Sequence, residues 1–138
     1  MKDGMANNRF VLDTSAIFTL IEDEEGASRV EKVLKKNEVL ISWVSLIEMM
    51  YISQQEKGEE IAMNRYAMLK QLDAMIVWDT DEPILLMASK LKASRRLSFA
   101  DSIIGATAIQ YDAALLHKDP EYESLQDLVE MEVLPYKK

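Results

Sequence analysis

The chain has 138 residues, 49% of them hydrophobic, which fits one domain with a core of ordinary size. Its 24 acidic and 16 basic residues give a net charge of -8, which argues against a large basic surface for nonspecific nucleic-acid binding. The absence of Cys, the single His and the four scattered Gly exclude disulfides, thiolate metal sites, two-histidine chemistry and glycine-rich phosphate loops. Carboxylates acting with a hard metal ion are the main chemistry that remains.

The polar N-terminus lacks the apolar stretch of a signal peptide, so residues 1–8 are expected to be a flexible leader outside the fold. Residues 9–138 are expected to form a single domain. No uncharged apolar run approaches the roughly 20 residues that a membrane span needs. Together with the absence of Cys, this composition leads us to expect a cytoplasmic protein without membrane contact.

Short apolar runs alternate with helical patterns along the chain. The predicted elements are strand 9–12, helices 16–21 and 27–36, strand 38–42, helices 45–56 and 59–72, strand 75–78, helices 81–93 and 98–111, and strands 113–116 and 131–134. Ser45 with Glu48, and Ser98 with Asp101, have the spacing of a capping box, so helices are expected to begin at Ser45 and Ser98. The alternation predicts an α/β domain with a short, mostly parallel sheet of four or five strands flanked by helices.

Four acids lie where predicted helices begin or predicted strands end: Asp13, Glu48, Asp101 and Asp119. They are separated by 35, 53 and 18 residues. Because the carboxyl ends of parallel strands and the N-termini of the following helices share one edge of the sheet, these acids could converge on one pocket. Several carboxylates in apolar surroundings repel one another, and a divalent cation is the usual remedy.

Each of these acids also has a purely structural interpretation. Asp13 and Asp119 could cap the segments that follow them, while Glu48 and Asp101 could complete their capping boxes. Position along the chain alone leaves both interpretations open.

Four segments carry a resemblance to a known family. They are Phe10-Val11-Leu12-Asp13-Thr14-Ser15-Ala16, Ser45-Leu46-Ile47-Glu48, residues 97–108 (LSFADSIIGATA) and residues 115–122 (LLHKDPEY). Together they resemble a PIN domain, and more narrowly a VapC-type toxin ribonuclease, from Arg9 to about Leu134. No single segment is specific, but the four occur in the family's order and at its usual spacing.

The resemblance implies an acidic pocket that binds Mg²⁺ or Mn²⁺ and cleaves single-stranded or loop RNA, whether tRNA, rRNA or mRNA. Its catalytic and metal-binding acids fall on Asp13, Glu48, Asp101 and Asp119, of which Asp13 and Asp101 are expected to be direct ligands. One or two cations would fit such a site. The resemblance also implies a cognate antitoxin and a homodimer. His117 stands where many members have Thr or Ser, which leaves its role open.

Five further residues are candidates for substrate binding. The hydroxyl of Thr14 or Ser15 matches a family position that helps orient metal or water, and Arg95, Arg96 and Lys118 could grip RNA phosphates. Charged loop residues of this kind are more often solvated surface.

Other functions remain as alternatives to a toxin. A PIN nuclease of RNA processing would carry the same acids, and a catalytically silent PIN-like module would bind RNA or a partner only. A receiver domain or a haloacid-type phosphatase is disfavoured, since Asp13-Thr14-Ser15 lacks the second acid of a D-x-D motif.

Overall fold

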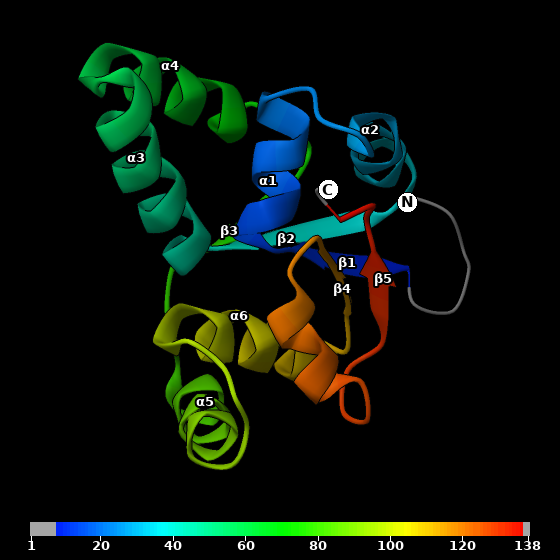
Figure 1. Ribbon diagram of the computed structural model, residues 1–138. Coiled ribbons are helices and arrows are strands. Elements are labelled where there is room, and N and C mark those ends of the chain that lie inside the picture. The colour runs from blue at the N-terminus through cyan, green and yellow to red at the C-terminus, as the bar shows by residue number, and fades with distance from the viewer. Residues whose placement is uncertain (1–7, 137–138) are drawn as a thin grey trace.

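The computed structural model describes residues 8–136, so the predicted leader lies outside the described residues except for Asn8. At its centre is a parallel sheet of five strands in the order β3-β2-β1-β4-β5. The strands are β1 (Arg9–Leu12), β2 (Glu38–Ser42), β3 (Met75–Val77), β4 (Ala114–His117) and β5 (Met131–Val133). The α/β fold with a short parallel sheet is therefore confirmed (Figure 1).

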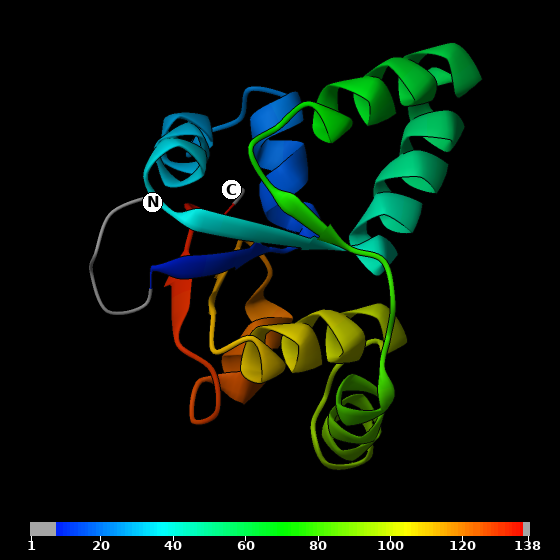
Figure 2. The ribbon, with the colours of Figure 1, turned by 180° about the vertical axis from the view of Figure 1, so that it is seen from behind.

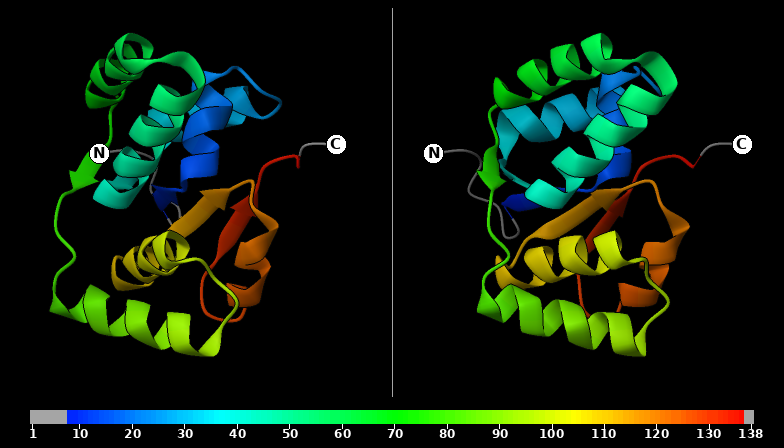
Figure 3. Two further views of the ribbon diagram at one scale, coloured as in Figure 1. Left: turned by 60° about the vertical axis from the view of Figure 1, so that its left-hand side comes forward. Right: turned by 90° about the vertical axis from the view of Figure 1, so that its left-hand side faces the viewer.

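Helices cover both faces of this sheet. They are α1 (Thr14–Ile21), α2 (Ala27–Lys36), α3 (Trp43–Lys57), α4 (Glu59–Lys70), α5 (Glu82–Ser94) and α6 (Phe99–Gln110), with a 3₁₀ segment η1 (Pro120–Leu125) after β4. Helices α1 to α4 lie on one side, and α5, α6 and η1 lie on the other (Figures 1 and 2). Helix α5 packs outside α6, farther from the sheet (Figure 3).

Each face of the sheet has its own hydrophobic core. Val11, Leu40 and Leu115 point toward α5, α6 and η1, where they join Ile104 and Leu125. The alternate strand residues point the other way and pack against α1 to α4; they include Phe10, Leu12, Ile41 and Leu116. Because strand side chains alternate between faces, three-residue to five-residue strands suffice to fill both layers.

The start of α3 differs from the sequence-based expectation. Its N-cap is Ser42, whose hydroxyl accepts a hydrogen bond from the Val44 amide at 3.2 Å, and not Ser45. Ser45 lies inside the first turn with its hydroxyl buried and without a hydrogen-bond partner among residues 8–136. The predicted capping box of Ser45 and Glu48 is therefore wrong, because β2 passes into α3 with no intervening loop. Glu48 is left available for other contacts.

The remaining elements begin and end within a few residues of their predicted bounds. Ser98 caps α6 as expected, its hydroxyl accepting a hydrogen bond from the Asp101 amide, and Asp81 caps α5 by accepting from the Ile84 amide. Within residues 8–136, none of the helices has the length and apolar character needed to cross a membrane.

Candidate functional site

The first site residue, Asp13, is held rigidly at the end of β1. Its amide donates to the Leu116 carbonyl of β4 at 3.0 Å, and its side chain caps α1 by accepting from the Ser15 amide at 3.0 Å. The Ser15 hydroxyl donates to the same carboxylate oxygen, Oδ2. Asp13 is only 2% exposed. The capping interpretation of Asp13 is thus correct, and it places a buried carboxylate at the strand edge.

Asp101 lies in the first turn of α6, where only half of the predicted capping box forms. The Ser98 hydroxyl accepts from the Asp101 amide at 3.1 Å. The Ser98 amide, however, donates at 3.2 Å to Glu121 and not to Asp101. The carboxylate of Asp101 is therefore not used for capping and turns toward Asp13.

A single tyrosine joins these two acids. The hydroxyl of Tyr122 lies 2.6 Å from Oδ1 of Asp13 and 2.9 Å from Oδ1 of Asp101. Tyr122 comes from η1 and its side chain is fully buried. One hydroxyl group thus bridges two carboxylates that are 88 residues apart in the sequence.

Three carboxylates approach closely enough to share a cation. Asp101, Asp119 and Glu121 each offer one oxygen, and these three oxygens lie within 4.8 Å of one another. Asp119 precedes η1 and accepts from the Glu121 amide at 3.0 Å, so the same turn orients both residues. Oxygen ligands of this kind suit Mg²⁺ or Mn²⁺, which prefer carboxylates and water.

Glu48 reaches the same region from α3. Its Oε1 accepts the Thr14 hydroxyl at 2.6 Å, which ties α3 to the first residue of α1. The negative charges of Asp13 and Asp119 help to raise the pKa of Glu48, and the charge of Glu48 helps to raise the pKa of Asp101. The structure therefore brings together all four acids that the sequence singled out.

Burial raises the pKa of three of the site carboxyls, those of Asp101, Asp13 and Glu48. It is the main cause that raises the pKa of Asp101 to about 8, and the negative charge of Asp13 adds to the effect. Burial likewise raises the pKa of Asp13 and of Glu48, against the opposing hydrogen bonds from Ser15 and Thr14. A divalent cation would offset the repulsion among the ionised forms, so the donor set fits such an ion.

His117 is a buried structural residue at the end of β4. Its Nδ1 accepts the Asp119 amide at 3.0 Å, and its Nε2 has no hydrogen-bond partner among residues 8–136. Burial lowers its pKa, which keeps the ring neutral. Its ring packs against that of Tyr122, with the centroids 5.0 Å apart.

The candidates for substrate binding occupy different positions. Thr14 and Ser15 lie at the site, where they hold Glu48 and Asp13. Arg95 donates to Asp127 and to the Ser124 carbonyl, which fastens the loop before α6 to η1 and the turn after it. Arg96 is exposed on the same loop.

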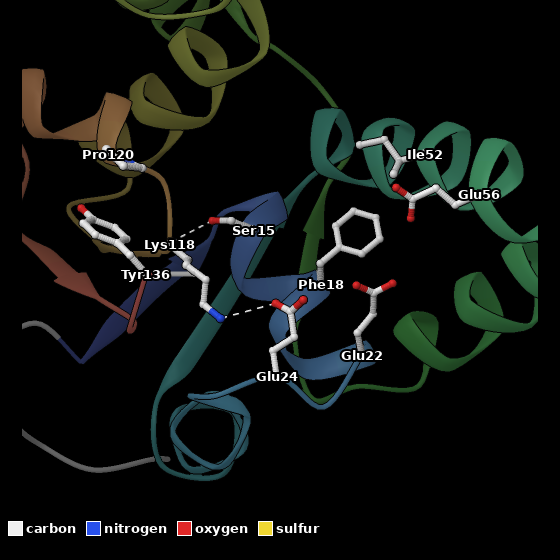
Figure 4. A pocket seen from close by; sticks show the side chains of 9 residues that line it. All are labelled: Ser15, Phe18, Glu22, Glu24, Ile52, Glu56, Lys118, Pro120 and Tyr136. Carbon is white, nitrogen blue, oxygen red and sulfur yellow. Dashed lines mark hydrogen bonds and ion pairs between the residues drawn. The ribbon is translucent and has the colours of Figure 1, made fainter. Parts of the chain in front are cut away.

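Lys118 belongs to a groove beside the acids. Its amide donates to the Ser15 hydroxyl, and its ammonium reaches Glu24 at 3.4 Å and the Glu25 carbonyl at 3.0 Å. Figure 4 shows this groove, which has a volume of about 410 Å³ and is hereafter called the α1–α3 groove. It is lined by Ser15, Phe18, Glu22, Glu24, Ile52, Glu56, Lys118, Pro120 and Tyr136.

Two residues of the site, Glu121 and Tyr122, were not singled out from the sequence. Both lie in the segment after Asp119 that carries part of the resemblance, but helical spacing gives no hint of them because η1 is a short 3₁₀ turn. The Asp119-Pro120 pair, which favours a turn, was the available signal.

Comparison with known proteins agrees with this fold. The PIN domain family model matches residues 10–128. No curated protein matches the chain. Among solved structures, VapBC2 from Rickettsia felis, bound to a DNA fragment from its promoter, has a TM-score of 0.76 at 17% identity and covers 92% of this chain and 99% of its own.

Two further structures have the same fold. A toxin-antitoxin complex from Klebsiella pneumoniae has a TM-score of 0.71 at 17% identity, covering 92% of this chain and 98% of its own. VapC20 from Mycobacterium tuberculosis, a toxin that cleaves the sarcin-ricin loop, has a TM-score of 0.71 at 16% identity, covering 91% and 99%. Because the family model matches most of the chain, including all four acids, the chain belongs to the PIN domain family.

Proposed function

We propose that this protein is a metal-dependent endoribonuclease and the toxin of a VapBC-type toxin–antitoxin pair. One observation carries the proposal: carboxylate oxygens of Asp101, Asp119 and Glu121 lie within 4.8 Å of one another. The Tyr122 hydroxyl links Asp101 to Asp13 at the end of β1, and Glu48 reaches the same region from α3. Membership of the PIN domain family supports it. The fold shared with a toxin that cleaves the sarcin-ricin loop favours single-stranded or loop RNA as substrate.

In this proposal Asp101, Asp119 and Glu121 would hold Mg²⁺ or Mn²⁺, with Asp13 beside them. When bound, the ion would supply positive charge at the scissile phosphate and lower the pKa of water. Glu48, fixed by the Thr14 hydroxyl, would accept the proton of the attacking water, a role that suits a carboxylate whose pKa burial has raised. Attack on phosphorus would break the bond to the 3′ oxygen.

Cleavage of a labelled RNA loop tests this function. We expect activity with Mg²⁺ or Mn²⁺, none with excess chelator, and a loss of at least 100-fold in Asp101→Asn. Asp79→Asn is the matched control, because Asp79 is an exposed acid that also follows a strand. Full activity in chelator or in Asp101→Asn would refute the proposal. RNA binding without any cleavage would favour the catalytically silent module.

The α1–α3 groove supports a basic antitoxin as partner. The side chains that line it include the acids Glu22, Glu24 and Glu56 and the apolar residues Phe18 and Ile52 (Figure 4). Lys118 is the one basic residue among the described residues that line the groove, and its ammonium contacts the Glu24 carboxylate. A segment that alternates arginine or lysine with apolar residues would match this lining.

We also propose that the protein acts in the cytoplasm and as a homodimer. Exposed apolar side chains on α5 and at the start of α6, namely Leu85, Leu86 and Phe99, offer a surface for the second copy. Sedimentation at increasing concentration checks this: a monomer at every concentration would contradict it.

A further inference from the structure

Tyr122 holds the oxygen atoms of two site carboxylates from a fully buried position. Its hydroxyl lies within hydrogen-bond distance of Oδ1 of Asp13 and of Oδ1 of Asp101. The other oxygen of Asp13, Oδ2, receives the amide and the hydroxyl of Ser15. Both carboxylate oxygens of Asp13 therefore accept hydrogen bonds. The Tyr122 hydroxyl, which contacts one of them, also contacts Asp101.

The ring that carries this hydroxyl is itself fixed. It is 0% exposed and packs against the His117 ring at a tilt of 57°. His117 in turn accepts the Asp119 amide, and Asp119 caps the turn that contains Tyr122. One short turn thus supplies two of the clustered acids, Asp119 and Glu121, together with the hydroxyl that spans Asp13 and Asp101.

We propose that Tyr122 is a positioning residue: its hydroxyl keeps the carboxylates of Asp13 and Asp101 at a fixed separation, so that the cation meets a preformed set of oxygens. This inference rests on the proposed function of the site as a metal centre. Groups that orient metal ligands through hydrogen bonds typically contribute 10–100-fold to metal affinity.

The variant Tyr122→Phe isolates this role, because it retains the ring that packs against His117 and removes only the oxygen. We expect its Mn²⁺ dissociation constant, measured by titration calorimetry, to rise by about tenfold or more. In cleavage assays, the Mn²⁺ concentration for half-maximal rate should rise by a similar factor while the KM for RNA stays unchanged. Tyr111→Phe is the matched control: Tyr111 is half-buried at the opposite end of α6.

The outcomes separate this inference from the proposed function. Equal Mn²⁺ affinity in Tyr122→Phe and wild type would show that the hydroxyl does not position the metal ligands. This result would overturn the inference but would not affect the proposed nuclease function. Absence of Mn²⁺ binding by the wild type would overturn both.

A measurement on the wild type avoids dependence on the variant's folding. The Cζ carbon of Tyr122 can be followed by NMR in protein labelled at tyrosine, with assignment from phenylalanine variants of the other four tyrosines. Addition of Mg²⁺ should shift this resonance, since Asp101, one hydrogen-bond partner of the hydroxyl, becomes a ligand of the ion. An unshifted Tyr122 resonance at saturating Mg²⁺ would overturn the inference.

Discussion

Asp101 illustrates how one residue acquires a function that its local sequence conceals. By spacing it is the acid of a capping box, yet Glu121 takes over the contact with the Ser98 amide. The carboxylate is then left buried beside Asp13, where ionisation is costly. Capping by Glu121, 23 positions away from Ser98, is a tertiary contact, which no helical pattern encodes.

The environment of Asp101 predicts how stability depends on pH in the absence of metal. The folded protein keeps a proton on Asp101 up to about pH 8, whereas the ordinary pKa of an aspartate is 3.8. The folded state thus binds more protons than the unfolded state, so stability falls as pH rises toward about 8 and levels off above it. His117 acts with the opposite sign but only below its ordinary value of 6.5, because its pKa is lowered.

Thermal melts in chelator check this dependence. Between about pH 6.5 and 8 the melting temperature of the wild type should fall, and the fall should be shallower in Asp101→Asn, which has no proton to lose. Parallel pH profiles for the two proteins would contradict the assignment of a raised pKa to Asp101.

At the scale of elements, the junction of β2 and α3 shows why helix starts are hard to place from sequence. Ser42 and Ser45 both precede apolar helical residues, and Glu48 makes the later serine look like the better cap. The structure begins α3 directly after β2, which makes Ser42 the cap and lets Glu48 accept from Thr14. The misplaced helix start concealed the contact that fixes a site residue.

Two alanine substitutions distinguish these serines. Ser42→Ala should lower the free energy of unfolding by about 1 kcal/mol, because the Val44 amide loses its acceptor. Ser45→Ala should be neutral or slightly stabilising, because it removes a buried hydroxyl that lacks a hydrogen-bond partner among residues 8–136. Urea titrations measure both. A larger loss in Ser45→Ala than in Ser42→Ala would contradict the observed cap.

At the scale of the whole molecule, some of the acidic residues behind the net charge of -8 are concentrated in two neighbouring places. Some lie in the acidic site, and others line the α1–α3 groove beside it. The alternation of strands with helices predicted the parallel sheet, and the placement of the four acids at strand ends and helix starts indicated that they could converge, since both follow from general rules of α/β topology. Glu121, Tyr122 and the groove depend on how η1 and α3 pack, which local patterns do not specify.

The groove predicts how an antitoxin would bind. Glu56→Lys, at its exposed rim, should weaken the complex with the product of a small reading frame neighbouring the gene by about tenfold and reduce its salt dependence. Glu31→Lys makes the same charge change on the exposed side of α2 and should have little effect. Binding measured by surface plasmon resonance at several salt concentrations checks this; equal effects of both variants would argue against the groove as the contact.

The most direct test of the metal centre is anomalous diffraction from crystals grown with Mn²⁺. We predict a manganese peak among the carboxylate oxygens of Asp101, Asp119 and Glu121, close to Asp13 and Glu48. The peak should disappear in crystals of Asp101→Asn. A saturated crystal with no peak at these oxygens, or with manganese bound only elsewhere, would contradict the account.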